Sequence, residues 1–131
     1  MKKLVIVICL MLSGLSLLAE NEGRMVSTSQ TGGRYEIIQS NVARKMTFKL
    51  DKFTGDVFQY VMIDSKSNKY TWQKLDVLGK YNFEADTIIS YQIFMGGFYA
   101  SDCILLNIHT GVTYKLYEDS QTKELFFTKF F

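Results

Sequence analysis

Proline is absent from this 131-residue chain, and cysteine, histidine and tryptophan are scarce, with two, one and one residues respectively. Without proline, the edges of any β-sheet must be protected by charge, by bulges or by pairing. One histidine and two cysteines do not supply the ligands that a zinc site usually has. We therefore expect no metal site and no cofactor.

The first residues have the pattern of a secretory signal peptide. Lys2 and Lys3 precede an apolar run over residues 4–18, and the small residue Ala19 is followed by a polar stretch. The run is interrupted by small polar residues and is shorter than the roughly 20 residues that a membrane-spanning helix needs. We expect cleavage near Ala19, a periplasmic or secreted product, and no membrane span in the mature chain.

Removal of residues 1–19 changes both the charge and the cysteine count. The full chain has 15 basic and 13 acidic residues, and the loss of Lys2 and Lys3 leaves 13 of each. Such a chain has no basic footprint for nucleic acid, so nucleic-acid binding is excluded. Cys9 leaves with the signal, and Cys103 remains alone in an apolar segment, which predicts a buried free thiol and no internal disulfide.

The chain does contain an internal repeat at a spacing of 56 residues. Residues 35–38 align with 91–94, and residues 48–60 with 104–116; after the loss of one residue, 70–75 align with 125–130. A repeat of this length is an architectural unit. We expect a leader over 20–33 and a single domain over 34–131, which divides into a first unit (34–75), a connector (76–89) and a second unit (90–131).

Each unit is expected to form four β-strands joined as an antiparallel meander. Apolar and polar residues alternate with a period of two, and no segment sustains the 3.6-residue period of a helix. This alternation also predicts which side chains face the core. The expected inward positions are Met46, Phe48, Leu50, Phe58, Tyr60 and Met62 in the first unit, and Ile104, Leu106, Tyr114 and Leu116 in the second.

The motif D/N-x-x-T-G connects the second and third expected strands of each unit, at residues 51–55 and 107–111. Asp51 or Asn107 bonds the backbone ahead of it, and Gly55 or Gly111 supplies the positive φ that a tight turn with a bulge requires. Two such meanders predict an all-β domain of about eight strands, folded as a small sandwich or barrel.

This hairpin motif resembles the one in blades of quinoprotein-type β-propellers. The chain is also similar to short exported bacterial proteins of unknown function that contain duplicated R-Y…D-x-x-T-G units. Propellers typically have four or more blades, so two units do not close a ring, and a homodimer that pools four units is the exception. The resemblance implies no catalytic residues.

Single residues that suggest chemistry have simpler structural explanations. His109 lies in the second hairpin turn, without the sequence context of a catalytic nucleophile, and is expected to be a solvated turn residue. Asp51 and Asp56 offer oxygens for calcium, but the second unit has Asn107 and Val112 at these positions. A turn-forming role for Asp51 is therefore the expected one.

Acidic pairs give the alternative of a hydrolase that uses two carboxylates, at Glu118 with Asp119 or at Glu84 with Asp86. Neighbouring acidic residues in loops are more typical of a solvated edge. Gly96 and Gly97 follow an expected strand but lack the spacing of a phosphate-binding loop, so a bulge is expected there.

Aromatic residues make up 15% of the chain, more than the inward positions of eight short strands need. Exposed aromatic side chains beside glycines can stack on sugars or peptides. The sequence therefore predicts a non-enzymatic binding or interaction module for a protein or carbohydrate, with a structural homo-oligomer or the carboxylate hydrolase as alternatives. The expected binding residues are Phe98, Tyr99, Trp72 and Tyr81.

The aromatic C-terminal segment, residues 125–131, resembles the last strand of outer-membrane β-barrels. Strands of such barrels need about 9–11 residues to cross the bilayer, and the expected strands here are shorter. A membrane barrel is therefore a minor alternative.

Overall fold

The computed structural model describes residues 26–27, 32–40, 43, 45–80, 87–96, 99 and 102–130. The expected signal peptide and most of the expected leader lie outside the described residues. Within the described part, every regular element is a β-strand, the strands form two sheets, and no residue is in an α-helix. The all-β class is therefore confirmed.

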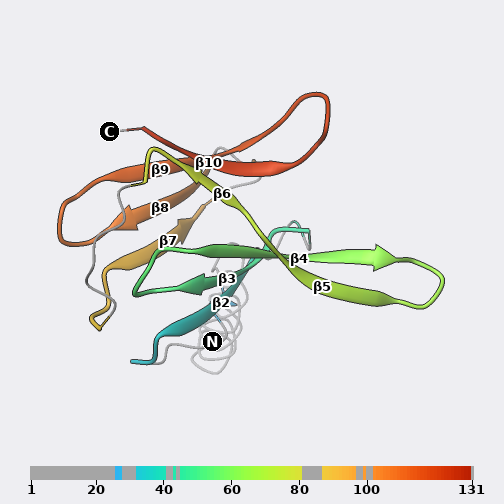
Figure 1. The fold of residues 1–131 in the computed structure, drawn as a ribbon, viewed down its shortest axis with the longest axis horizontal. Helices are drawn as coiled ribbons and strands as arrows, with labels where there is room; N and C mark the ends of the chain where they lie inside the picture. Colours follow the sequence, from blue (N-terminus) through green and yellow to red (C-terminus); the bar gives the residue numbers. More distant parts are fainter. Residues whose placement is uncertain are drawn as a thin grey trace, which may run out of the picture.

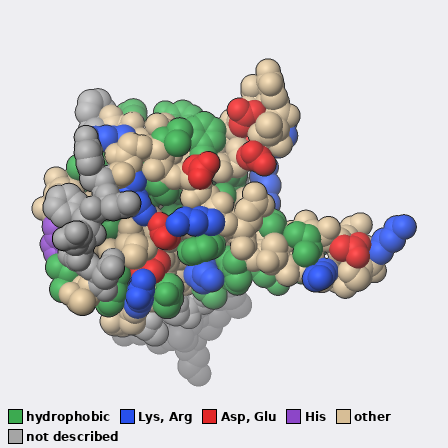
Figure 2. All heavy atoms as spheres, in the orientation of Figure 1, with side chains coloured by type: hydrophobic (Ala, Val, Ile, Leu, Met, Phe, Trp, Pro, Cys, Tyr) green, Lys and Arg blue, Asp and Glu red, His purple; other side chains and the backbone are tan. Residues whose placement is uncertain are grey.

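The first sheet is a meander in which each strand pairs antiparallel with the next (Figure 1). The two-residue β1 lies at one edge, and the outer part of the β4–β5 hairpin projects from the body of the molecule (Figures 1 and 2). The strands are β1 (Val26–Ser27), β2 (Tyr35–Gln39), β3 (Thr47–Asp51), β4 (Val57–Asp64) and β5 (Lys69–Lys74).

The second sheet is a meander of four antiparallel strands, β7 (Tyr91–Met95), β8 (Cys103–Asn107), β9 (Thr113–Glu118) and β10 (Leu125–Lys129). A fifth strand, β6 (Asp76–Leu78), pairs parallel with β10. The order β6-β10-β9-β8-β7 has two free ends, as does the order β1 to β5 in the first sheet. The barrel alternative is therefore wrong, because neither sheet closes on itself in the described structure.

One extended segment contributes a strand to each sheet. Only Leu75 separates β5 in the first sheet from β6 in the second. Leu75 is buried, and its N–H donates to the carbonyl of Val57 at 2.8 Å, so the chain is held at the point where it changes sheets. Residues 76–89 were expected to be a connector between the units. The first part of this segment forms β6, which pairs with β10, the last strand of the chain.

The two meanders have the same strand registers. Tyr35 pairs with Asp51, and Tyr91 pairs with Asn107, so both members of the second pair lie 56 positions after those of the first. In the outer hairpins, Trp72 pairs with Tyr60 in the first unit, and the corresponding pair in the second unit is Phe127 with Leu116.

The single residue by which the units differ in length lies at a β-bulge in β4. The β4–β5 register shifts between Met62 and Asp64, which leaves Ile63 as the extra residue of the first unit. Beyond it, Asp64 accepts from the Lys66 N–H at 2.9 Å, as Asp119 accepts from the Gln121 N–H at 2.8 Å. The two turns are therefore equivalent, and the bulge absorbs the length difference.

One hydrophobic core lies between the sheets, and both sheets contribute to it. The first sheet and the residues beside its strands supply Ile38, Met46, Phe48, Leu50, Val57 and Leu75. The second supplies Tyr91, Ile93, Met95, Cys103, Leu105, Tyr114, Leu116, Leu125 and Phe127.

The two units present opposite faces to this core. Phe48 and Leu50 are fully buried, whereas the residues 56 positions later, Ile104 and Leu106, lie on the outer face and are half-buried. Conversely, Leu105 is fully buried, and its counterpart Lys49 lies on the outer face of the first sheet. The inversion also holds for β2 with β7 and for β4 with β9, whereas β5 has no buried residue although its counterpart β10 buries Leu125 and Phe127.

Half of the predicted inward positions are therefore wrong. Ile104 and Leu106 face outward, as do Phe58, Tyr60 and Met62, while Met46, Phe48, Leu50, Tyr114 and Leu116 are buried as predicted. The physical reason is that these strands have large side chains on both faces, as is typical of sheets that are covered on both sides. Alternation then does not indicate which face is inside.

The units meet where the first hairpin turn contacts the start of the second unit. The carbonyl of Lys52 accepts from the N–H groups of Ser90 at 2.8 Å and Tyr91 at 2.9 Å. Gly55, with φ of 73°, lies against the Tyr91 ring so closely that a Cβ at this position would be 2.7 Å from Tyr91 Cδ1. This junction fixes the second sheet on the first.

Candidate binding surface

The outer face of the first sheet carries a row of large apolar side chains, which we call the aromatic face. Its members belong to one face because cross-strand partners point to the same side of a sheet. Five of them are between 39% and 52% exposed. The aromatic face consists of Tyr35, Ile37, Phe58, Tyr60, Met62, Tyr70 and Trp72.

The rings of the aromatic face are already ordered by contacts with each other. Tyr60 stacks on Tyr70 with centroids 4.9 Å apart and ring planes at 9°, and it meets Trp72 at 5.1 Å and 48°. The Lys49 ammonium lies 4.6 Å from the Phe58 ring centroid and 5.1 Å from that of Trp72. A partner would therefore meet a pre-organised surface, which lowers the entropy cost of binding.

One end of the aromatic face is held by an ion pair. Arg34 Nη2 lies 2.7 Å from Asp51 Oδ2, and its guanidinium lies over the rings of Tyr35 and Phe53 at 5.3 and 5.4 Å. Burial acts to raise the pKa of Asp51, but hydrogen bonds from Arg34 and from the N–H groups of Phe53 and Thr54 outweigh it. The pKa of Asp51 is therefore held below its ordinary value.

Asp56 also has structural partners. Its carboxylate accepts from Lys80 at 2.6 Å and from Lys74 at 2.8 Å. Burial opposes ionisation, but these two lysines outweigh it and lower the pKa of Asp56. Asp51 and Asp56 are thus bound to cations of the chain itself, and Asp51 also forms the turn by accepting from Phe53 and Thr54.

The outer face of the second sheet is also apolar, and we call it the second outer face. Phe94 is 64% exposed on β7, and Tyr117 stacks on Phe126 with centroids 6.0 Å apart. Lys115 lies at the middle of this face, 5.4 Å from the Phe130 ring centroid. The apolar members of the second outer face are Phe94, Ile104, Leu106, Tyr117, Phe126 and Phe130.

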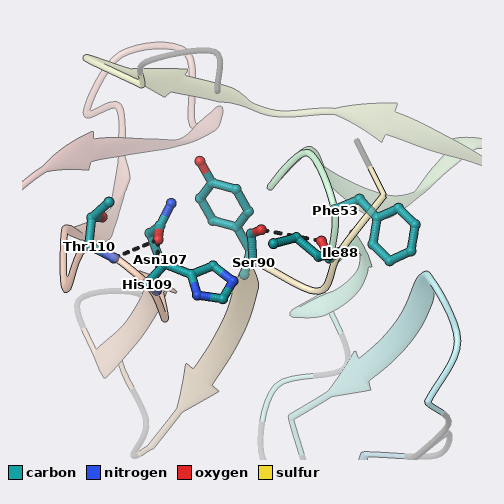
Figure 3. A pocket seen from close by; sticks show the side chains of 7 residues that line it. Phe53, Ile88, Ser90, Asn107, His109 and Thr110 are labelled. Atoms are coloured by element: carbon teal, nitrogen blue, oxygen red, sulfur yellow. Dashed lines mark hydrogen bonds between the residues drawn. The ribbon is translucent and has the colours of Figure 1, made fainter. Parts of the chain in front are cut away.

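A pocket of about 190 Å³ lies between the two hairpin turns (Figure 3). Figure 3 shows Phe53 on one side of it and His109 on the other, with Ser90 between them. His109 Nε2 lies 3.0 Å from the carbonyl of Ile89, which only accepts, so Nε2 is the donor in this contact. The described lining is mainly apolar and has no carboxylate, so the pocket suits a small apolar group rather than acid–base chemistry.

The predicted binding residues are only partly described. Trp72 lies on the aromatic face, and Tyr99 is 73% exposed in the β7–β8 connection, where its N–H donates to Asp102 Oδ2 at 3.2 Å. Phe98 and Tyr81 lie outside the described residues. No described contact joins Trp72 to Tyr99, so the structure divides the expected site between the two sheets.

Most of the aromatic face was not predicted from the sequence, because the alternation of residues placed Phe58, Tyr60 and Met62 in the core. One residue of the sequence did indicate the outer face, namely Lys49 in β3. In the second unit, the equivalent position holds the buried Leu105. A lysine is rarely buried without a partner, so it marks its face as the outer one. Tyr60 and Trp72 lie on that same face.

The carboxylates and the thiol that remain have structural roles. Glu118 pairs with Lys45 at 3.3 Å and with Lys123 at 3.8 Å, while Asp119 forms the β9–β10 turn; Glu84 and Asp86 lie outside the described residues. Cys103 is fully buried, as predicted, and burial raises the pKa of its thiol to about 12. Among the described residues, no three His, Cys, Asp or Glu side chains form a group suited to a metal ion.

Comparisons with known proteins give no match: no protein-family model matches the chain, and no curated protein or solved structure is significantly similar to it. In the described part of the chain, no helix has the length and apolarity needed to span a membrane. Function is therefore inferred from the geometry of the chain's own residues.

Proposed function

We propose that this protein is an exported, non-enzymatic interaction module that binds a macromolecule through its aromatic face. The observation that carries the proposal is the exposure of this face, where seven large apolar side chains lie together on one side of a sheet. Apolar patches of this kind on a soluble protein mark interaction sites, because leaving them in water has a cost that a partner removes.

The composition of the face favours a protein partner over a sugar. Ile37 and Met62 extend the row of rings with aliphatic side chains, and Met and Tyr are enriched in protein interfaces. Among the described pockets, none is lined by residues of the aromatic face, so its described part is an open sheet face, which suits another flat surface. Lys49 adds one cation at its middle.

The fold itself supports a module built by duplication. The two meanders share their registers, their turn chemistry and the D/N-x-x-T-G motif, as two copies of one unit would. We propose that they stack face to face in the manner of neighbouring propeller blades, which accounts for the inverted burial: each unit covers the next with its other face.

Trp72 tests the proposal directly, because it is the only tryptophan of the chain and lies on the aromatic face. Acrylamide quenching of its emission is measured with a cell-envelope polysaccharide, with extended apolar peptides and with rising concentrations of the protein itself. Binding is expected to protect Trp72 from quenching with at least one of the three. Unchanged quenching with all three would reject the aromatic face as a binding surface.

A matched control places the single tryptophan at another position of the chain. In the double variant Trp72→Phe with Tyr99→Trp, the only tryptophan lies in the exposed β7–β8 connection instead. The polysaccharide and the peptides are expected to leave its quenching unchanged. Protection of this second probe alone would place the binding site in the loop that the sequence predicted.

A further inference from the structure

We infer that the partner of the aromatic face is a second copy of this chain, which docks its second outer face there in a head-to-tail arrangement. This inference rests on the proposed function, since it names the occupant of the same surface. The sheets of successive chains would then stack face to face, as the two sheets of one chain do.

The first argument is that the chain already shows how these faces are covered. Inside one chain, the face with Phe48 and Leu50 packs with the face that contains Leu105, Leu116 and Phe127. Each unit also has an outer face, and each outer face is equivalent by the repeat to the buried face of the other unit. The aromatic face corresponds to the buried face of the second unit, and the second outer face corresponds to the buried face of the first.

Residue by residue, the correspondence is close. Tyr60 and Trp72, on the aromatic face, occupy the positions of Leu116 and Phe127, which are both fully buried. Repeating the internal contact between chains would bury them in the same way. An aromatic face paired with another aromatic face would have no counterpart within the chain.

The second argument comes from the junction between the units. Gly55 packs on the Tyr91 ring; its counterpart Gly111 has a similar left-handed φ, 72°, and no atom of the described residues lies within 4 Å of a Cβ built there. The counterpart of Tyr91 is Tyr35, which is 52% exposed. Gly111 of one chain and Tyr35 of the next are therefore the two halves of a contact that the chain makes once internally.

The backbone shows the same correspondence. The Lys52 carbonyl accepts from the Tyr91 N–H within the chain. The counterpart of Lys52 is Ile108, which is 45% exposed, and no described group donates to its carbonyl. A head-to-tail neighbour would bring the N–H of its Tyr35 to this carbonyl, so hydrogen bonding would set the register of the contact.

The net charges of the whole units also favour contact between unlike units. Residues 34–74 contain eight basic and four acidic residues, whereas residues 91–129 contain three basic and four acidic residues. Contact between two first units would therefore bring like charges together, while contact between a first and a second unit brings opposite net charges together. Because the two docking surfaces differ, each added copy covers one of them and leaves its other surface free at the end of the assembly. The assembly can therefore grow until it closes into a ring.

Complementation between two blocking variants tests the inference. Tyr60→Glu places a charge on the aromatic face, and Phe94→Glu places one on the second outer face. Sedimentation velocity is measured from about 1 μM to about 1 mM protein, with the wild type purified in the form that the producing cell secretes or retains after processing. At the highest concentrations the wild type is expected to form dimers and larger oligomers. Each variant alone is expected to remain monomeric.

The mixture of the two variants is the decisive sample. The intact second outer face of Tyr60→Glu still fits the intact aromatic face of Phe94→Glu, so equal amounts are expected to form a 1:1 dimer and nothing larger. A monomeric mixture of folded variants, or a Phe94→Glu protein that associates like the wild type, would overturn the head-to-tail contact. Circular dichroism checks that both variants are folded.

A second pair of variants serves if either charge prevents folding. Tyr35→Ala removes the ring of the proposed junction, and Gly111→Asn adds a side chain that tolerates a left-handed backbone. The same complementation is expected from this pair. A wild type that stays monomeric while a polysaccharide or peptide protects Trp72 would reject the head-to-tail partner and leave the proposed function standing.

Discussion

Gly55 lies directly against the ring of Tyr91, where a Cβ would stand 2.7–2.8 Å from three atoms of the ring. This contact joins the turn of the first unit to the first strand of the second. Its closeness is possible only because glycine has no side chain and accepts the φ of 73° found there. The glycine of the turn motif thus serves the turn and the contact between the sheets.

Gly55→Ala is expected to destabilise the protein more than Gly111→Ala does. Both changes place alanine at a left-handed φ, which costs about 1–2 kcal/mol, but only the first pushes a methyl group into the Tyr91 ring. We expect the collision to add at least about 1 kcal/mol. Urea unfolding at low protein concentration measures both, and equal losses would contradict the contact.

The Arg34–Asp51 ion pair predicts an acid-sensitive component of stability. The folded-state pKa of Asp51 lies below its ordinary value of 3.8, so the ion pair stabilises the fold above that value. This contribution is lost as the pH falls through the lowered pKa. Asp51→Asn, which keeps an oxygen for the turn, is expected to cost about 1–2 kcal/mol at neutral pH, and this difference should shrink below about pH 4.

The second turn supplies the control for this pH experiment. Asn107 accepts from the N–H groups of His109 and Thr110, both at 3.0 Å, and Ser90 stands where the first unit has Arg34. Asn107→Asp therefore gains no arginine and is expected to add no stability at neutral pH. A stabilising Asn107→Asp, or an Asp51→Asn cost that is independent of pH, would show that the ion pair is not the source.

Deletion of Ile63 is expected to be tolerated, because this residue is 54% exposed and forms the bulge that the second unit lacks. Without it, β4 would continue into its turn with the register that β9 already has. We expect a loss below about 1 kcal/mol in urea unfolding, as for most exposed positions.

Deletion of Tyr117 is the matched case, since β9 has no spare residue and Tyr117 pairs with Phe126. Its removal should shift the β9–β10 register or disrupt the turn at Asp119, and so cost clearly more. If the two deletions cost the same, Ile63 does not act as a spare residue.

Local chemistry made part of this fold predictable. The D/N-x-x-T-G motif predicted both hairpin turns, since Asp51 and Asn107 bond the backbone ahead of them and Gly55 and Gly111 have positive φ. The packing of the units against each other was not predictable in the same way. It depends on which face of each sheet is covered, and apolar alternation does not show this in strands with large side chains on both faces; only a charged residue such as Lys49 indicates the outer face.

The candidate binding surface was also only partly predictable from the sequence. Trp72 was predicted as a binding residue because it is aromatic, yet the stacking of Tyr60 on Tyr70 beside it became visible only from the pairing of β4 with β5. Lys49 indicates the outer face of β3, but which rings of β4 and β5 lie on that face follows only from the strand pairing.

The inverted burial of the two units can be tested with one substitution made twice. Tyr60 and Leu116 occupy equivalent positions, but Tyr60 is 41% exposed and Leu116 is fully buried. Leu116→Ala leaves a cavity in the shared core and is expected to cost about 2–5 kcal/mol. Tyr60→Ala removes ring contacts with Tyr70 and Trp72 and leaves no cavity in the core, so a smaller cost of about 0.5–1.5 kcal/mol is expected.

Urea unfolding of both variants is measured at a low protein concentration, where association contributes nothing to stability. At a high concentration, the head-to-tail contact predicts that the cost of Tyr60→Ala rises, because the wild type then buries Tyr60 against a neighbour. The cost of Leu116→Ala should not rise to the same extent, since this side chain is buried within one chain. If Tyr60→Ala costs as much as Leu116→Ala in the dilute monomer, the aromatic face belongs to the core of the chain and is not a surface for a partner.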